Sequence, residues 1–406
     1  MGAEDVDARR AVVLVIDSAG IGALPDAAAY GDEGAATWQN TAAAVGGLRC
    51  PTLERLGLGR VAPIQGLEAT PTPAGFAGRL AEVSPGKDTT TGHWELMGLE
   101  LDTPFALYPH GFPPEIVEPF VARTGRPVLG NRAASGTAIL EELGAEHLRT
   151  GAWILYTSAD SVFQLAAHEE KVPLEELYAA CRAARELLDR HRVGRVIARP
   201  FLGRPGAFER TYHRHDFSMR PDRPTVLDAL GAAGVPVVGV GKIADIFAGA
   251  GVPRNVGTEG NADGLRKTRA LLDEVPRGLV FANYVDTDMV FGHRRNPAGY
   301  ARALEEIDAA LPGLQAALRP ADLLLVTADH GCDPTFGAHT DHTREYVPLV
   351  AWSPALGRGG DLGTRRSFAD VGASVADWLG VRWDGPGASI LPALGLAGPA
   401  GAGGAA

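Results

Sequence analysis

The stretch 323-LLLVTADHG-331 joins an apolar run to an adjacent carboxylate and imidazole. A run such as Leu323–Val326 is typical of a strand that is buried on both faces of a parallel sheet. In α/β proteins, polar residues that follow such a strand lie at the carboxyl edge of the sheet, where ligands bind. Asp329 and His330 offer oxygen and nitrogen donors, which suit Zn or Mn rather than an ion that prefers thiolates. The stretch therefore predicts a metal site at the end of a buried strand.

Similar short runs rich in Val, Ile and Leu recur along the chain, at Val12–Ile16, Val193–Ala198, Val237–Val240, Leu279–Val285 and Val347–Trp352. Helical patterns lie between many of them, at Pro173–Arg190, Tyr300–Leu318 and Phe368–Leu379. This alternation predicts an α/β fold with a mainly parallel sheet that is flanked by helices.

The length of 406 residues suggests two domains, or one large domain with an insertion. Candidate metal ligands fall at both ends of the chain, at Asp17 and from Asp288 onward, while the middle has no such strand-end pair of carboxylate and imidazole. We therefore predict a core of residues 1–103 and 220–394, interrupted by an inserted domain at 104–219 whose two connections act as hinges.

Composition narrows the class of protein. Hydrophobic residues make up 45% of the chain, enough for a sizeable core, and the net charge of -11 argues against nucleic-acid binding. The three cysteines are too scattered for a disulfide framework, and no signal peptide or membrane span is visible. We expect a cytoplasmic protein with no membrane partner. The tail 395–406, almost only Gly, Ala and Pro, is expected to be disordered.

The N-terminal strand ends in VIDSAGIG, residues 15–22. Asp17 could bind a metal there, and the amides of the following turn could approach a phosphate. The alternative is that Asp17 caps the start of a helix.

A second motif is 86-GKDTTTGH-93. A threonine hydroxyl is a poor nucleophile unless a metal ion binds it and lowers its pKa. Thr89 is the candidate nucleophile, and the alternative is a threonine-rich turn whose hydroxyls cap a helix.

The remaining candidate ligands follow the later strands. Asp288 and His293 share a glycine-containing turn, although Asp286 could serve instead of Asp288, or the turn could be a solvated loop. His342 lies in the polar run after Asp329 and His330, near which Cys332 offers an alternative thiolate ligand. Two metal ions held by such donors would bind both the attacking and the leaving oxygen of a phosphoryl transfer.

The predicted insert carries signals of a different kind. The run 156-YTSADS-161 offers hydroxyls and a carboxylate that suit a sugar. Arg195, Arg199 and Arg210 could hold a distal phosphate, although each could equally be a solvated surface charge. In the core, Lys242 follows an apolar run and is a candidate phosphate contact.

Taken together, these motifs resemble those of the prokaryotic-type phosphopentomutases, within the alkaline phosphatase superfamily, from about Val12 to Leu394. The matching stretches are 17–22, 86–95, 156–161, 194–200, 291–295 and 340–346. Asp-His-Gly is shared across the superfamily, whereas the Gly-Lys-Asp-Thr and Asp-His-Thr-Arg-Glu runs together are specific to the mutases.

The resemblance implies an alkaline-phosphatase-like core with an inserted α+β cap domain. It selects Asp288 over Asp286. One Mn ion would be held by Asp288, His293 and His342. The second would be held by Asp17, Asp329 and His330, together with the oxygen of Thr89. The positions that match sugar-phosphate contacts are Ser158, Asp160, Arg195, Arg210 and Lys242.

The implied activity is the interconversion of ribose 1-phosphate and ribose 5-phosphate, or their deoxyribose analogues, through phosphorylated Thr89. Two Mn ions are expected, other divalent metals being compatible with the ligands, with a sugar bisphosphate as primer and a monomer favoured. Rival hypotheses are a phosphatase or a cofactor-independent phosphoglycerate mutase of the same superfamily. A metal-stabilised binding protein without catalysis is a third, but it leaves the Thr89 turn unexplained.

Overall fold

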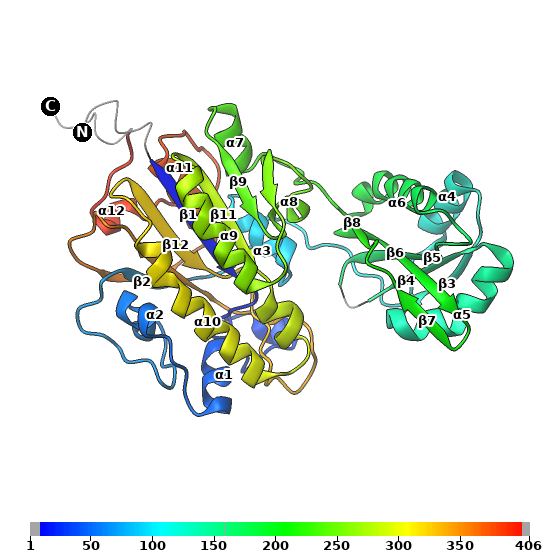
Figure 1. Cartoon of the computed structure of the whole chain (residues 1–406), viewed down its shortest axis with the longest axis horizontal. Helices are drawn as coiled ribbons and strands as arrows, with labels where there is room; N and C mark the ends of the chain where they lie inside the picture. Colours follow the sequence, from blue (N-terminus) through cyan, green and yellow to red (C-terminus); the bar gives the residue numbers. More distant parts are fainter. Residues whose placement is uncertain (1–8, 159, 400–406) are drawn as a thin grey trace. The chain divides into compact units, whose positions relative to one another are not determined.

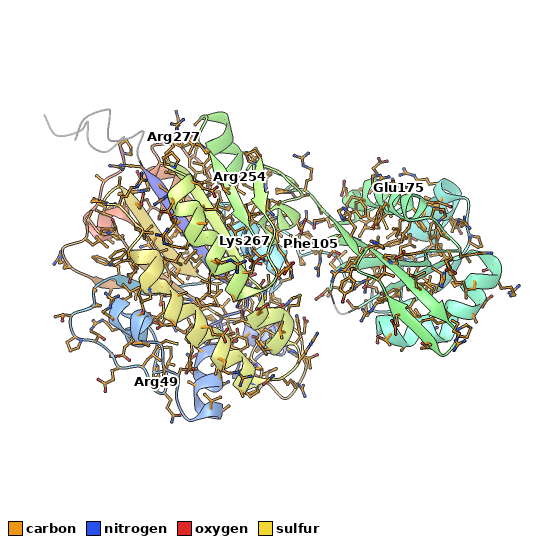
Figure 2. All side chains as sticks on the ribbon, in the orientation of Figure 1. Arg49, Phe105, Glu175, Arg254, Lys267 and Arg277 are labelled. Carbon is orange, nitrogen blue, oxygen red and sulfur yellow. The ribbon has the colours of Figure 1, made fainter. Side chains whose placement is uncertain are left out.

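The computed structural model describes residues 9–158 and 160–399 and divides into two compact units. The first, here called the core, comprises the chain up to Thr103 and from Pro221 onward. The second, here called the insert, is Pro104–Arg220, one residue longer than the predicted 104–219. Side chains fill the space between helices and sheet in each unit (Figure 2).

The core is built on an eight-stranded sheet (Figure 1). Its strand order is β10 (Arg254–Val256), β9 (Val237–Val240), β11 (Gly278–Tyr284), β1 (Arg10–Ile16), β12 (Asp322–Thr327), β13 (Val347–Trp352), β2 (Phe76–Leu80) and β14 (Gly360–Arg365). Neighbouring strands run parallel from β10 to β12, and β14 runs parallel to β2. The predicted mainly parallel sheet is confirmed. Strand β13, which is antiparallel to both of its neighbours, is an addition to it.

Helices cover both faces of this sheet. Alternate side chains of β11 show the two faces, because Phe281 contacts His93 and Phe247 whereas Tyr284 bonds to Thr268. The face of Phe281 carries α3 (Thr89–Leu96), α7 (Val226–Ala232), α8 (Ile243–Ile246) and α11 (Asp370–Trp378). The face of Tyr284 carries α9 (Asn261–Glu274) and α10 (Pro297–Gln315). The core also contains α1 (Thr37–Val45), α2 (Pro51–Leu56), the π-helical turn η5 (Thr287–Gly292) and α12 (Leu391–Leu394).

The insert is an α+β unit around a second sheet. The sheet order is β3 (Val128–Ala133), β4 (Trp153–Thr157), β5 (Val162–His168), β6 (Arg195–Arg204) and β7 (Ala207–Arg210), and β8 (His215–Ser218) also pairs with β6. One face, with Trp153 and Leu155, packs on α4 (Pro114–Thr124) and α6 (Leu174–Leu188). The other face, with Ile154 and Tyr156, packs on α5 (Gly136–Thr150).

Strands β2 and β14 were not among the predicted runs. The sequence of β14, GDLGTR, is polar and glycine-rich, so its pattern does not indicate a strand. It forms because β2 has a glycine, Gly78, where the two strands meet. A Cβ at Gly78 would lie 2.5 Å from the carbonyl oxygen of Gly363. Pairing here depends on the close approach of two glycines, which periodicity cannot reveal.

The first residues of the predicted disordered tail have contacts with the core. Positions 395–399 lie against the core, where Arg9 Nη1 donates to the carbonyl of Ala397 at 2.9 Å. A Cβ at Gly398 would lie 2.0 Å from Asp377 Oδ1, so the absence of a side chain is what allows this contact. The rest of the predicted tail, 400–406, lies outside the described residues.

Candidate functional site

Three carboxylates lie at the carboxyl edge of the core sheet. Strands β1, β11 and β12 are parallel neighbours, so their carboxyl ends reach the same edge. Asp17 directly follows β1, Asp329 follows β12, and Asp288 lies in η5 just after β11. All three are buried. Segments that are far apart in the sequence thus deliver carboxylates to one place.

His330 faces two of these carboxylates. Its Nε2 atom lies 3.5 Å from Asp17 Oδ1 and 3.3 Å from Asp329 Oδ2. The hydroxyl oxygen of Thr89 is 3.1 Å from the same Nε2 atom. One potential ligand atom from each of Asp17, Asp329 and His330 lies within 4.8 Å of the others, a spacing that a single ion can span.

Asp288 faces two other histidines. Its Oδ2 is 3.3 Å from His293 Nε2, and its Oδ1 is 3.6 Å from His342 Nε2. The His342 ring centroid lies 4.7 Å from that of His293 and 4.2 Å from that of His330. The two groups of potential ligands are therefore adjacent, as a pair of neighbouring ions requires.

Asp286 and Cys332, the alternative ligands that the sequence left open, have different surroundings. Asp286 Oδ2 accepts a hydrogen bond from the backbone N–H of Asn261 at 2.7 Å, at the start of α9. The Cys332 thiol lies 3.9 Å from His293 Nδ1, but burial raises the pKa of Cys332 to about 12, with the charge of Asp288 adding to the effect. Asp288 therefore fits a ligand role better than Asp286. The Cys332 thiol lies in one group with Asp288 and His293 that could also hold an ion, and it keeps its proton at neutral pH while no metal is bound.

Thr89 lies at this site because Gly92, three residues later in the same helix, allows that helix to pack closely on the sheet. Helix α3 begins at Thr89, and the Asp88 side chain caps it by accepting from two backbone amides of the first turn. A Cβ at Gly92 would lie 1.9 Å from the carbonyl oxygen of Asp329. Only glycine permits α3 to pack so closely on the end of β12, and this packing brings the Thr89 hydroxyl to His330.

Ser18 holds the turn after β1 in a strained conformation. Its φ of 68° lies in the left-handed region, which costs a non-glycine residue about 1–3 kcal/mol. The surroundings fix it, since Ser18 N–H donates to Asp329 Oδ1 at 3.0 Å and Tyr300 Oη donates to the Ser18 carbonyl at 2.8 Å. The strained turn thereby ties Asp17 to Asp329.

Each of these carboxylates has one oxygen without a hydrogen-bond partner among the described residues. Asp17 Oδ1 and Asp288 Oδ1 are buried and have no hydrogen-bond partner among the described residues. Burial, together with the charges of Asp329 and Asp288, raises the pKa of Asp17 to about 7. Uncompensated buried carboxylates are costly, and divalent cations with oxygen and nitrogen ligands would satisfy them. The residues present therefore fit a metal centre.

The imidazoles respond to the same charges. Burial opposes the charged form of His330, but Asp329 and Asp17 outweigh it and raise the pKa of His330 to about 9. Burial likewise opposes the charged form of His293, but Asp288 and Cys332 raise the pKa of His293 to about 12. Cationic imidazoles thus offset part of the negative charge of the metal-free carboxylates.

Two further buried residues hold the candidate ligands, and the sequence analysis assigned neither to this task. His93 Nδ1 lies 3.1 Å from Asp329 Oδ2 and 2.9 Å from the carbonyl oxygen of Thr89. Asn283 Nδ2 donates to Asp17 Oδ2 at 3.0 Å. The signal for Asn283 was its polar side chain within the otherwise apolar β11, because a buried amide requires partners.

Within the insert, predicted contact residues line a cavity of about 300 Å³. Ser158, Asp160, Arg195 and Arg210 all belong to its wall. Arg214 and Gln164, which no sequence pattern singled out, also line it. The cavity gathers residues from strands β4 to β7 and from the start of α5.

Some of the cavity's positive charge is compensated. Arg195 lies 3.4 Å from Asp160 and 3.8 Å from Asp216. Arg214 binds the Asp216 carboxylate through both Nε and Nη2, each at 2.7 Å. These pairs hold the two guanidinium groups in place.

The positive charges of Arg199 and Arg210 are not compensated by carboxylates of the described residues. Among the described residues, neither Arg199 nor Arg210 has a carboxylate partner at ion-pair distance, and Arg199 Nε donates instead to the neutral Gln164 Oε1 at 3.0 Å. Burial, and then the nearby charge of Arg214, lowers the pKa of Arg199 to about 10. A cavity with uncompensated guanidinium groups suits an anion such as a phosphate.

Lys242 belongs to the core and not to this cavity. It lies just after β9, at the same edge of the sheet as the carboxylates, since β9 runs parallel to β11. Its exposed Nζ is 4.0 Å from Met289 Sδ in η5. A cation there lies close to the turn that carries Asp288.

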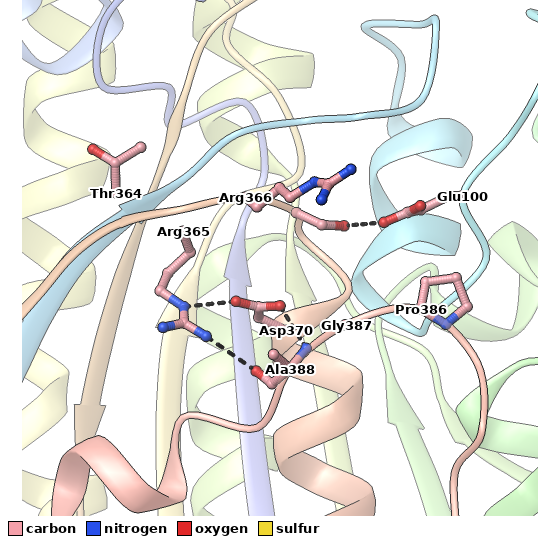
Figure 3. Close-up of a pocket in the computed structure, with 9 residues that line it drawn as sticks. Glu100, Thr364, Arg365, Arg366, Asp370, Pro386, Gly387 and Ala388 are labelled. Atoms are coloured by element: carbon pink, nitrogen blue, oxygen red, sulfur yellow. Dashed lines mark hydrogen bonds and ion pairs between the residues drawn. The ribbon is translucent and has the colours of Figure 1, made fainter.

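The core has another cavity, of about 540 Å³, that none of the predicted residues lines (Figure 3). Its charged groups are largely paired within the wall: Arg365 Nε donates to Asp370 at 2.6 Å, and Glu100 accepts from Ser367 at 2.6 Å. It lacks the converging imidazoles of the candidate metal centre.

None of the helices in the described part of the chain is long and apolar enough to cross a bilayer.

Comparison with known proteins identifies the family of the chain. The model of the Metalloenzyme superfamily matches residues 9–382. A phosphopentomutase from Anaeromyxobacter dehalogenans is 63% identical over 92% of this chain and 95% of its own. A phosphopentomutase from Syntrophotalea carbinolica is 57% identical over 91% of this chain and 94% of its own. Among solved structures, a phosphoglycerate mutase from Leishmania mexicana aligns with a TM-score of 0.46 and 12% identity, over 94% of this chain and 97% of its own.

Proposed function

The chain belongs to the phosphopentomutase family within the metalloenzyme superfamily and is thus an enzyme of the isomerase class, and we propose that it interconverts ribose 1-phosphate and ribose 5-phosphate through a phosphothreonine at position 89. The deoxyribose analogues are included in the proposed substrate class. The proximity of the Thr89 hydroxyl to His330, at 3.1 Å, is the observation that carries the proposal.

In the proposed cycle, phosphorylated Thr89 gives its phosphoryl group to the free hydroxyl of a pentose monophosphate. The bond from phosphorus to Thr89 Oγ1 breaks, a bond from phosphorus to the sugar oxygen forms, and the proton of the sugar hydroxyl passes to Thr89. The resulting pentose bisphosphate then returns its other phosphoryl group to Thr89. The bond from that phosphorus to the sugar oxygen breaks, a bond to Thr89 Oγ1 forms, and the threonine proton passes to the freed sugar oxygen. The cycle leaves the isomeric monophosphate and the original phosphoenzyme, so a sugar bisphosphate can serve as primer.

The residues proposed as metal ligands divide into two sets. Asp17, Asp329 and His330 would hold one ion beside Thr89. Asp288, His293 and His342 would hold the other. Bound divalent ions, which we propose to be manganese, would neutralise the transferring phosphoryl group and favour the ionised threonine.

The chain's own residues supply the positioning. The strained Ser18 turn and the close packing at Gly92 fix Thr89 against the candidate ligands. His93 holds the Thr89 carbonyl and the Asp329 carboxylate together. Such fixed geometry is what phosphoryl transfer requires, because catalysis of this reaction is mainly positioning and charge stabilisation.

For the insert we propose recognition of the sugar phosphate. Ser158 and Asp160 would bind sugar hydroxyls, and Arg195 and Arg210 would bind the phosphate that is not being transferred. Lys242 is proposed as a phosphate contact from the core. The excess of guanidinium groups in the cavity supports this division of roles.

The test is substitution of the proposed nucleophile, with its neighbour as control. We expect Thr89→Ala to abolish conversion of ribose 5-phosphate while retaining the fold, and Thr90→Ala, the same change one residue away, to retain activity. Protein incubated with Mn and a pentose bisphosphate would be analysed by intact mass and peptide mapping. Substantial turnover by Thr89→Ala, or a phosphate on another residue, would refute the proposal. Greater activity toward 3-phosphoglycerate than toward ribose 5-phosphate would identify a different mutase.

A further inference from the structure

Arg344 has a buried guanidinium whose nitrogen atoms are all occupied. Its side chain is 3% exposed. The two N–H groups of Nη1 are shared among three acceptors, Glu82 Oε2 at 2.7 Å and the carbonyl oxygens of Ser84 at 2.8 Å and Gly86 at 2.6 Å. Nη2 donates to the Glu82 carbonyl at 3.0 Å, and both Nε and Nη2 reach Asp26. These contacts from one side chain hold the carboxylates and carbonyl groups that they bind in fixed positions.

The contacts of Arg344 hold residues 82–86, the segment that leads into Thr89. The carbonyls of residues 82, 84 and 86 all bind the one guanidinium. The amides of Val83 and Ser84 are bound in turn by the Glu95 carboxylate, at 2.9 Å and 2.7 Å. This irregular segment therefore has its carbonyls held by Arg344 and amides held by helix α3, so its path into Thr89 is determined by side chains.

Arg344 itself belongs to the loop that carries the candidate ligand His342, which is two residues earlier in the sequence. The backbone N–H of Arg344 donates to Asp32 Oδ2 at 2.7 Å. Lys87 Nζ lies 3.0 Å from that same oxygen, and Asp32 is fully buried. Asp32 thus joins the His342 loop to Lys87, which is two residues before Thr89. Two separate contacts, through Arg344 and through Asp32, link the same pair of loops.

We propose that Arg344 is a positioning residue for phosphoryl transfer, which sets where Thr89 stands relative to the histidine loop without touching the substrate. The inference rests on the proposed function for the role of Thr89. Nothing but a guanidinium suits the task, because it spreads five donors over a rigid plane, whereas a lysine has a single compact ammonium. A lysine would keep the charge opposite Glu82 but would lose several of the carbonyl contacts.

The decisive variant is Arg344→Lys, since Arg344→Ala would leave the Glu82 carboxylate buried without its partner. We expect kcat to fall about 100-fold, as for a misplacement of about 1 Å, while KM for ribose 5-phosphate stays within about threefold. The Mn content should match that of the wild-type enzyme. Amide exchange within residues 84–90 should rise about tenfold as the segment loosens.

Arg365→Lys is the matched control. Arg365 also binds a carboxylate, Asp370, and a backbone carbonyl, that of Ala388, but it lies in the cavity wall of Figure 3. This variant should retain kcat and leave exchange in residues 84–90 unchanged. A second variant, Glu82→Gln, removes the charge that Arg344 pairs with and should lower kcat about tenfold.

The outcomes are separable. An Arg344→Lys enzyme with the kcat and exchange pattern of the Arg365→Lys control would overturn the inference, and so would a loss of kcat no greater than the loss of folded protein. If Arg344→Lys does not fold, unchanged kcat and exchange in Glu82→Gln would overturn it. Absence of phosphate on Thr89 in the wild-type enzyme would refute the proposed function instead, and the exchange measurement would still report on Arg344.

Discussion

Carboxylates gather at the edge of the core sheet, whereas guanidinium groups gather in the cavity of the insert. Asp17 and Asp329 are buried to 1% and 0% exposure, while the Arg195 side chain is 34% exposed. The acidic site has unpaired carboxylate oxygens that water does not reach, so the cations that we propose there would stabilise it. The basic site is more open to solvent, as the proposed exchange of an anionic substrate at each turnover requires.

This difference predicts unequal tolerance to change. The core site depends on close packing and on residues from separate strands, so a disturbance of any part should remove most of the activity. The insert cavity has several arginines, so the loss of one should weaken binding by a measurable but smaller factor.

Metal removal should have the greatest effect. Chelation is expected to lower turnover of ribose 5-phosphate by at least about 1,000-fold, because the buried carboxylates lose the charges that position the phosphoryl group. The melting temperature should fall as well, since an ion at 100 times its Kd stabilises the folded state by about 2.7 kcal/mol. Adding Mn should restore both, as measured by a coupled assay and by calorimetry.

Neighbouring aspartates provide the control for that experiment. Asp288→Asn should lose Mn and activity, whereas Asp286→Asn should keep its Mn because Asp286 caps α9 instead of facing the histidines. Metal analysis of both purified variants separates the two positions. Loss of Mn from Asp286→Asn with retention in Asp288→Asn would reverse the assignment.

Substitution of Gly92 should come next. A Cβ there would lie 1.9 Å from the Asp329 carbonyl oxygen, so Gly92→Ala must push α3 away from β12. Displacement by about 1 Å should lower kcat about 100-fold, and overpacking should cost about 1–3 kcal/mol. Gly313→Ala is the matched control, because Gly313 lies in α10 with open space around it and should gain about 0.5–1 kcal/mol. Equal effects of the two substitutions on kcat would contradict the role of close packing.

These residues also show what the sequence could predict. The apolar runs that end in Asp17 and Asp329 place both carboxylates at one edge, because parallel strands share their carboxyl ends. The approach of α3 at Gly92 and the carboxylate pairs of the insert are contacts between distant segments. No local period encodes such contacts, which is why Arg214 was not predicted, whereas the polar side chain of Asn283 within an apolar strand was a local signal. The roles of the ligand residues stay predictions.

The pH dependence of metal binding sharpens the electrostatic half of the comparison. The pKa of His330 is raised to about 9 and that of His293 to about 12, so both imidazoles carry protons in the metal-free enzyme at neutral pH. A bound ion requires neutral imidazole, so its binding must release protons. Apparent Mn affinity should therefore rise with pH between 7 and 8.5, about tenfold per unit for each proton released.

Isothermal titration in two buffers of different protonation enthalpy would count those protons. His293→Gln should release fewer protons than the wild-type enzyme. Affinity that does not change over this pH range, with no proton release, would show that the imidazoles are already neutral before the ion arrives.

The smallest effect should come from single arginines of the insert, and its size should follow their pairing. Arg210 has no carboxylate partner among the described residues, so Arg210→Met should raise KM for ribose 5-phosphate about tenfold, the equivalent of about 1.4 kcal/mol of lost phosphate binding. Arg195 shares its charge with Asp160 and Asp216, so Arg195→Met should raise KM only about threefold. In both variants kcat should change less than KM, because neither residue belongs to the core site. A larger fall in kcat than rise in KM for Arg210→Met would show that the insert takes part in the transfer itself, and the contrast between a cation-filled core and an anion-binding insert would then fail.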